Sequence, residues 1–450
     1  MLAEPADLVS ALVKVRRRLI PFLFLLYIVA YIDRINVGFA ALQMNAALGF
    51  SPETYGFGAG VFFLSYIACE IPSNIVLARV GARVWIARIM ITWGVISSAM
   101  MFVRSANGFY AARLLLGAAE AGFFPGIIFY LTRWCPLRER ARMIASFMTA
   151  TLLAGVVGAP LSGLLLSLDG AGGLAGWQWL FLLEGLPAVA LGFVVLSVLP
   201  ERPESAAWLT AEERAALASC LSAEGRTQST TAHTIGGALR SPGIWLLALL
   251  YFTMPVASYG IGFWLPQIIK TASGGSDVKV GLLTAVPYIV GAIGMVLIGR
   301  HSDRTGERRW HIAIAAFAGA AAAVTSGFVH GHGLAPSLAA LSIAMLAQAS
   351  MLGPFWALAT SRLSGSGAAA GIALINSVGN LGGFIGPFMM GYVQSRTRSF
   401  AAGLMVIGAI FVAGGALVLT FRADDPIDGP APDPGHSGEG KPTPPSHEAV

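Results

Sequence analysis

The chain has 450 residues, of which 56% are hydrophobic and only 12% are charged, and its net charge is +6 at pH 7. Soluble globular domains usually have a charged fraction of about a quarter, so this composition excludes a soluble globular protein. It is typical of a protein that crosses a membrane several times.

Twelve apolar stretches of about 20 residues follow one another, each long enough to cross a bilayer core of roughly 30 Å. The first six are expected at 19–42, 54–77, 84–102, 109–131, 141–168 and 179–199. The second six are expected at 244–269, 280–299, 312–329, 335–358, 368–393 and 400–421. The sequence therefore predicts an all-α integral membrane protein with twelve transmembrane helices.

The predicted spans divide into two halves. The longest hydrophilic interior segment, 200–241, separates a six-helix bundle at 19–199 from a second six-helix bundle at 242–421. Residues 1–18 are expected to form a cytoplasmic N-terminus, and the Pro- and Gly-rich residues 422–450 a disordered cytoplasmic tail. Both bundles are thus expected to be tethered through one cytoplasmic linker.

Within the linker, Thr210 and Glu213 have the spacing of a helix capping box. This spacing predicts a short surface helix over 214–224. The residues 435–442 superficially resemble a phosphate-binding loop, but the segment ends in Pro and no strand precedes it, so we expect no nucleotide site. The three cysteines have no metal-ligand spacing, so neither a metal nor a cofactor is expected.

The basic residues of the short loops give the expected orientation, because Lys and Arg are enriched on the cytoplasmic side of a membrane protein. One side would hold Lys14, Arg16, Arg17, Arg18, Arg79, Arg83, Arg133, Arg138, Arg140, Arg142, Arg300, Arg304, Arg308, Arg309 and Arg362. The other would hold Arg104, Lys270, Lys279, Arg396 and Arg398. Both termini are therefore expected in the cytoplasm. Basic residues shared among separate loops do not indicate nucleic-acid binding.

The two halves resemble each other at an offset near 225 residues. Arg79, Gly81 and Arg83 fall on Arg304, Gly306 and Arg308, and three glycines of the fifth span fall on three of the eleventh. Parallel six-helix repeats of this kind place a cavity between the halves near mid-membrane, which is the arrangement of the major facilitator fold.

The loop after the eighth span contains Asp303, Arg304, Gly306 and Arg308 in a Gly-x-x-x-Asp-Arg-x-Gly-x-Arg-Arg pattern. This pattern resembles the loop motif of major facilitator transporters, and its charges can latch one conformation and release in another. We call these four residues the C-half latch. Ordinary enrichment of basic residues is the alternative explanation. The corresponding loop of the first half has Ala78 in place of the Asp, which argues against the same latch there.

Among the charged side chains inside predicted spans, four lie in two spans, Asp33 and Arg34 in the first and Arg113 and Glu120 in the fourth. A charge near mid-bilayer costs roughly 2.5 to 3.5 kcal/mol, so the four indicate a polar cavity with a function. Arg113 and Glu120 are two helical turns apart and share one helix face, which can face the cavity. The alternative is that the four charges only neutralise one another within the bundle.

The first span reads Tyr31-Ile-Asp-Arg-Ile-Asn-Val-Gly-Phe-Ala40, and the fourth reads Arg113-Leu-Leu-Leu-Gly-Ala-Ala-Glu-Ala-Gly-Phe-Phe-Pro-Gly126. Together they resemble the anion:cation symporter family of the major facilitators, which includes bacterial tartrate, phthalate, hydroxyphenylacetate and sugar-acid permeases. The resemblance extends through all twelve spans and includes Glu201 to Trp208 of the linker.

The resemblance implies roles for individual residues. Asp33 and Glu120 would be protonation sites, and Arg34 or Arg113 would engage the substrate or gate protonation. Tyr31 and Tyr66 fall where the family places cavity hydroxyls. Asn376 and Asn380 resemble the substrate contacts of the second half, although an interhelical hydrogen bond explains them equally well. Glu70 and Glu184 also fall within spans, and a structural contact is favoured for Glu184.

These observations predict a secondary transporter and not an enzyme. We expect proton-coupled symport of a small organic anion, a carboxylate such as tartrate, phthalate, hydroxyphenylacetate or a sugar acid, by alternating access in the bacterial inner membrane. An anion exchanger and a membrane nutrient sensor on a transporter scaffold are the alternatives. The expected partners are the substrate, protons and the lipid bilayer, without nucleic acid or nucleotide.

Overall fold

The computed structural model describes residues 6–228, 240–329, 333–363 and 368–421, and within these ranges it is helical and contains no β-strand. The expected tail at 422–450, the segment 435–442, and the side chains of Arg138, Arg140 and Arg142 lie outside the described part. Within the described ranges, twelve helical segments are long and apolar enough to cross a membrane. The predicted twelve-helix membrane fold is therefore confirmed.

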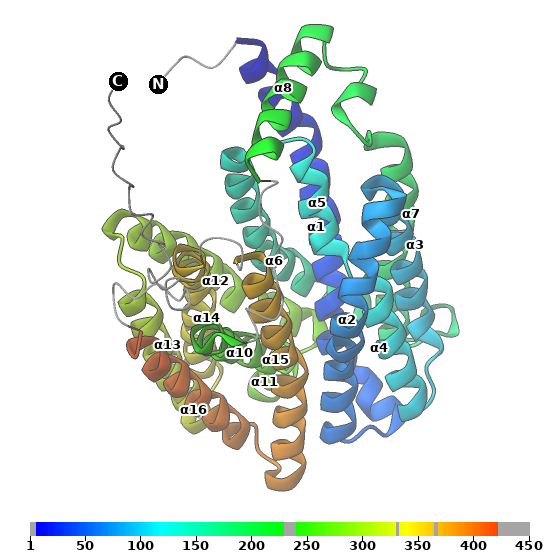
Figure 1. Ribbon diagram of the computed structural model, residues 1–450. Coiled ribbons are helices and arrows are strands. Elements are labelled where there is room, and N and C mark those ends of the chain that lie inside the picture. Colours follow the sequence, from blue (N-terminus) through cyan, green and yellow to red (C-terminus); the bar gives the residue numbers. More distant parts are fainter. Residues whose placement is uncertain (1–5, 229–239, 330–332, 364–367, 422–450) are drawn as a thin grey trace, which may run out of the picture.

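The helices form two bundles joined by the linker (Figure 1). The first consists of α1 (Ala6–Leu48), α2 (Pro52–Val80), α3 (Ala82–Ala99), α4 (Ala106–Glu120), α5 (Phe123–Thr132), α6 (Leu137–Leu166) and α7 (Gly176–Val198). After α8 (Ala211–Gln228), the second consists of α10 (Pro242–Gly262), α11 (Leu265–Ser273), α12 (Asp277–Thr305), α13 (Arg309–Val329), α14 (Leu334–Arg362), α15 (Ala368–Thr397) and α16 (Phe400–Leu419).

Two of the twelve spans are broken helices, which the hydropathy pattern did not predict. The fourth consists of α4 and α5, separated at Gly122, whose φ of 86° lies in the left-handed region that favours glycine. The seventh consists of α10 and α11, and a proline stands in the first turn of α11. The helix that contains the first predicted span begins at Ala6, upstream of residue 19.

The two bundles meet along α2 with α15 and along α6 with α12. Glycines permit this contact: a Cβ on Gly56 would lie 2.5 Å from the carbonyl oxygen of Pro387, and one on Gly281 would lie 2.5 Å from that of Ala159. Hydrogen bonds also cross between the bundles here. Gln43 Nε2 donates to Asp277 Oδ2 at 2.8 Å, and the Glu53 N–H donates to Ser395 Oγ at 3.0 Å. We call this end, opposite α8 in Figure 1, the closed end.

The predicted capping box is confirmed at the start of α8. The Thr210 N–H donates to Glu213 Oε2 at 2.9 Å, and the Glu213 N–H donates to Thr210 Oγ1 at 3.2 Å. Glu213 also accepts hydrogen bonds from Lys14 Nζ and Ser10 Oγ of α1, and these donors lower the pKa of Glu213 to about 2. The linker helix is therefore tied to the first turns of α1.

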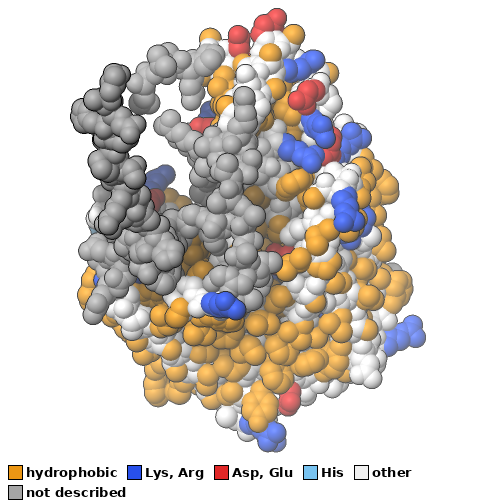
Figure 2. Space-filling model, viewed as in Figure 1, with side chains coloured by type: hydrophobic (Ala, Val, Ile, Leu, Met, Phe, Trp, Pro, Cys, Tyr) orange, Lys and Arg blue, Asp and Glu red, His pale blue; other side chains and the backbone are white. Residues whose placement is uncertain are grey.

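The surface agrees with a membrane location. Figure 2 shows hydrophobic side chains over the middle and lower parts of one face, whereas most charged side chains of that face gather at the end that carries α8. Many large apolar side chains are exposed, among them Phe102 at 69%, Phe328 at 66% and Ile71 at 65%. Lipid chains cover such side chains in a membrane without loss of free energy.

Candidate functional site

Arg34 of α1 and Glu120 of α4 form an ion pair inside the membrane-spanning region. The carboxylate side chain is 2% exposed, and the guanidinium side chain is 14% exposed. Arg34 also donates through Nη1 to the hydroxyl of Tyr259 in α10 at 3.5 Å, and its Nε has no hydrogen-bond partner within the described structure. The arginine therefore touches both halves and keeps unused donor capacity.

Aromatic rings surround the guanidinium of Arg34. Its Cζ lies 5.8 Å from the ring centroid of Tyr31 and 5.4 Å from that of Tyr66, within the range of a cation–π interaction. Tyr66 is buried and Tyr31 is half-buried. The structure thus brings Arg34, Glu120, Tyr31 and Tyr66 together.

The break between α4 and α5 positions Glu120. The helix ends at Glu120, and Ser73 Oγ of α2 donates to the carbonyl oxygen of Ala121 at 2.7 Å. A Cβ on Gly122 would lie 2.3 Å from Ser73 Oγ, so only glycine fits this approach. Trp85 Nε1 of α3 donates to the same Ser73 oxygen at 2.9 Å. The carboxylate therefore lies at a joint that three helices hold in place.

Asp33 points away from the ion pair of Arg34 and Glu120. It is 1% exposed and accepts hydrogen bonds from Asn36 Nδ2 at 3.0 Å, from Trp93 Nε1 at 2.6 Å and from Ser97 Oγ. Consecutive residues of a helix point about 100° apart, so Asp33 contacts α3 while Arg34 contacts α4 and α10. Three hydrogen-bond donors surround this carboxylate, and they are not arginines.

Sequence reasoning did not identify these donors to Asp33. Asn36 lies three residues from Asp33 on the same helix face, which is a visible signal. Trp93 and Ser97 are four residues apart on α3, but nothing in the sequence distinguishes them from ordinary packing residues. Their role depends on the packing of α3 against α1.

Arg113 is fully buried and faces α2. Its Nε donates to the carbonyl oxygen of Gly58 at 3.3 Å, and Nη2 donates to that of Ala59 at 2.9 Å. Its Cζ lies 4.9 Å from the ring centroid of Phe62, and Cζ of Arg34 lies 5.5 Å from the same centroid. The two arginines thus share one phenyl ring, but in this conformation Arg113 binds backbone and not an acidic side chain.

The second half contributes Asn376 and Asn380 from α15, and both are half-buried. Asn376 Nδ2 donates to Glu70 Oε1 of α2 at 3.4 Å, so it forms an interhelical contact between the halves. Glu184 of α7 accepts a hydrogen bond from Ser162 Oγ of α6 at 2.7 Å, which is the structural contact favoured for it.

The C-half latch is partly assembled. Arg308 Nη1 donates to Asp303 Oδ1 at 2.7 Å and to Ser302 Oγ at 2.9 Å. Gly306 follows the last turn of α12 with a φ of 70°, a conformation that favours glycine. Arg304 lies exposed in that last turn. The motif therefore brings one Asp and one Arg together across the loop.

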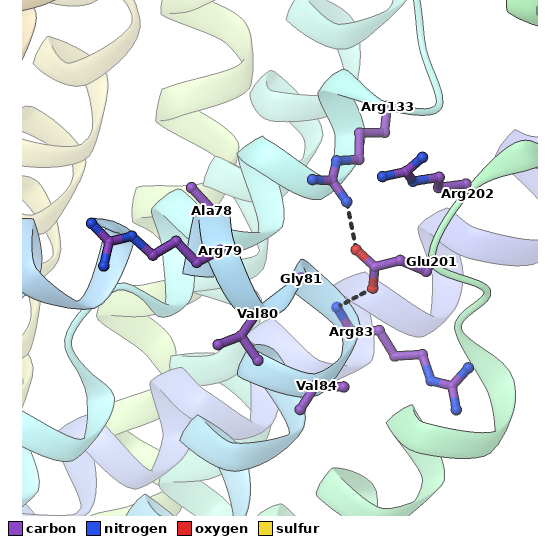
Figure 3. Close-up of a pocket in the computed structure, with 9 residues that line it drawn as sticks. All are labelled: Ala78, Arg79, Val80, Gly81, Arg83, Val84, Arg133, Glu201 and Arg202. Carbon is purple, nitrogen blue, oxygen red and sulfur yellow. Dashed lines mark hydrogen bonds and ion pairs between the residues drawn. The ribbon is translucent and has the colours of Figure 1, made fainter. Parts of the chain in front are cut away.

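In the first half, the linker supplies the carboxylate that the loop lacks (Figure 3). Glu201 accepts hydrogen bonds from the Ala82 and Arg83 N–H groups, each at 3.0 Å, and from Arg133 Nη1 at 2.5 Å. It caps the N-terminus of α3, where the helix dipole favours a negative charge. The sequence prediction considered only position 78 and therefore missed this contact.

Among the described residues, no group of three His, Cys, Asp or Glu side chains is placed to hold a metal ion. Cys69, Cys135 and Cys220 form no disulfide within the described part of the chain.

Comparison with known proteins finds similarity to membrane transporters. The profile of the Major Facilitator Superfamily matches residues 23–387 and 280–446. The chain is 48% identical over 418 residues to an Agrobacterium vitis protein named as a candidate tartrate transporter, covering 92% of this chain and 91% of that protein. It is 43% identical over 405 residues to a quinolone resistance transporter of Acinetobacter baumannii, covering 90% and 92%.

Among solved structures, a bacterial homologue of the human lysosomal transporter Spinster, in an inward-facing and occupied conformation, superposes with a TM-score of 0.74. The identity is 17%, and the match covers 90% of this chain and 96% of that one. This likeness concerns the fold.

Proposed function

The chain belongs to the Major Facilitator Superfamily, and we propose that it couples the uptake of a small organic carboxylate to protons by alternating access. The family and the twelve spans make it a multi-pass membrane transporter and not an enzyme. The substrate class and the coupling ion form the proposal.

The ion pair between Arg34 and Glu120 carries the proposal. A guanidinium matches a carboxylate through two parallel hydrogen bonds, so a substrate carboxylate competes with Glu120 for the same partner. Arg34 is the accessible member of the pair, and it has an unpaired Nε. Substrate binding would release Glu120, which would then take up a proton because an unpaired carboxylate is costly inside a membrane.

Asp33 is the second proposed proton site. Its three donors stabilise the ionised carboxylate in this conformation. A rearrangement of α1 against α3 would remove donors and favour protonation. Two sites suit the energetics, because each charge that crosses 100 mV is worth about 2.3 kcal/mol. One proton only neutralises a monoanion such as a sugar acid, whereas two let the potential drive its uptake. For a dianion such as tartrate, two protons neutralise the charge and remove the opposing effect of the potential.

The neighbouring polar groups support a hydroxylated carboxylate such as tartrate or a sugar acid, with phthalate and hydroxyphenylacetate as aromatic alternatives. Tyr31, Tyr66, Asn376 and Asn380 would provide hydrogen bonds to substrate oxygens. We assign Arg113 to gating, since its hydrogen bonds hold α2 against α4. The tartrate name of a 48% identical relative agrees with this class.

The basic loops support a cytoplasmic location of both termini and of the C-half latch, in the bacterial inner membrane. The closed end would then face the outside.

The decisive experiment measures internal pH in proteoliposomes that contain the purified protein while hydroxy-, sugar- and aromatic carboxylates and a fluoroquinolone are added outside. We expect proton entry with particular carboxylates, lost in Asp33→Asn and Arg34→Ala and kept in the control Arg104→Gln, which alters an exposed loop arginine. Carboxylate exchange without proton movement would replace symport with an exchanger. Carboxylate binding without transport would indicate a sensor, and a response to the quinolone alone would refute the substrate class.

A further inference from the structure

A cavity of about 430 Å³ lies where α2 and α5 end and α3 begins, on the side of the linker. Its lining consists of Ala78, Arg79, Val80, Gly81, Arg83, Val84, Arg133, Glu201 and Arg202. Four arginines and one glutamate give the lining a formal charge of +3. Figure 3 shows Arg133 and Arg202 beside Glu201, whereas the side chains of Arg79 and Arg83 extend from the turn between α2 and α3 in opposite directions.

The carboxylate of Glu201 is already used within this cavity. It accepts two backbone N–H groups of α3 and the guanidinium of Arg133. Arg79, Arg83 and Arg202 have no acidic partner among the residues that the structure describes, and Nε of Arg83 is buried there without a hydrogen-bond partner. The cavity therefore has unpaired positive charges and unused hydrogen-bond donors, which favour the binding of an anion.

Two apolar side chains lie at the edge of the same cavity. Val80 is 48% exposed and Val84 is 47% exposed, and both lie at the boundary between candidate membrane spans. A ligand that touches both the arginines and these valines carries a negative head group and an apolar portion. Arginine binds phosphate oxygens through its planar set of donors.

From this arrangement we propose that the cavity binds a phosphate group, and that an anionic phospholipid supplies it. The side chains of Arg83 and Arg202 turn toward the phosphate when it binds, with Arg79 at the rim, and the acyl region lies against Val80 and Val84. The lipid would join the linker, through Arg202, to the turn between α2 and α3. This site is separate from the proposed carboxylate site at Arg34, so the two proposals can fail independently.

The test uses the full chain in micelles that contain equal amounts of phosphatidylglycerol and phosphatidylcholine, with retained lipid counted by native mass spectrometry. We expect preferential retention of phosphatidylglycerol, reduced about fivefold for each arginine lost in Arg83→Gln and Arg202→Gln, the equivalent of about 1 kcal/mol near an anionic surface. Arg83→Lys with Arg202→Lys keeps the charge and should retain part of the preference. Arg104→Gln with Lys279→Gln, at the opposite end, is the matched control.

Inorganic phosphate distinguishes the two sources of the phosphate group. If millimolar phosphate does not displace phosphatidylglycerol, the lipid is supported as the ligand. If lipid preference is absent but phosphate protects the wild type and not the double Gln variant against thermal unfolding, the phosphate site stands with a soluble source. The site would be overturned if the wild type showed neither lipid preference nor protection by phosphate. It would also be overturned if the wild type and the double Gln variant behaved alike. Both conclusions hold whatever the transport assay shows.

Discussion

Arg34 and Glu120 form an ion pair that links α1 to the last residue of α4, and the same guanidinium reaches Tyr259 of the other half. The Arg34 side chain therefore contacts both a carboxylate of its own bundle and a hydroxyl of the opposite bundle. A substrate anion that binds here would change both contacts at once.

Glu120→Gln is expected to separate substrate binding from proton coupling. Without the competing carboxylate, Arg34 should bind the substrate about tenfold more tightly, equivalent to roughly 1.5 kcal/mol for a hydrogen bond to a charged group. Accumulation driven by a pH gradient should be lost. Calorimetric titration with the carboxylate identified in proteoliposomes measures the first effect. Unchanged gradient-driven accumulation would remove Glu120 from the coupling mechanism.

Gly281→Ala is expected to loosen the closed end. The added Cβ would lie 2.5 Å from the backbone oxygen of Ala159, and overpacking of this kind typically costs about 1 to 3 kcal/mol. Spin labels at Ala47→Cys and Arg396→Cys, exposed positions on the two halves, should report a longer distance. Gly299→Ala on the same helix meets no atom within 4 Å and is the control. Equal distances in both variants would contradict a contact that limits opening.

The spans were predictable because crossing a bilayer requires about 20 apolar residues, whatever the surrounding packing. The break at Gly122 was not, because one glycine with positive φ cannot be recognised among 54. Asp33 and Arg34 were visible as charges in an apolar stretch. Their partners were not, since Trp93 and Ser97 become donors only when α3 packs on α1.

Glu201→Ala is expected to lower thermal stability. The substitution removes the N-cap of α3, worth about 1 kcal/mol, and a half-exposed ion pair with Arg133 worth at most about another. The melting temperature in detergent should fall. The melting temperature of Glu201→Gln, which keeps one acceptor oxygen, should fall less. Glu204→Ala changes an exposed residue of the same linker and serves as control. A melting temperature equal to that control would show that the cap is dispensable.

The contact of Glu213 with α1 is expected to depend on pH. The pKa of Glu213 is lowered to about 2 from an ordinary value of 4.5, so its stabilising effect is complete above pH 4.5 and disappears as the pH falls toward 2. Glu213→Gln should therefore melt at a lower temperature than wild type at pH 7, and the difference should shrink below pH 4.5. Glu204→Gln should show no such trend. A difference that is constant with pH would mean that charge is not involved.

The length of α1 has a mechanical consequence. Its 43 residues form one continuous helix about 65 Å long, at 1.5 Å per residue. Near its start, Lys14 and Ser10 bind Glu213, and near its end, Gln43 binds Asp277 of the other half. Asp33 and Arg34 lie between these two attachments. A small tilt of this helix at Asp33 and Arg34 would therefore displace its two ends by a larger distance.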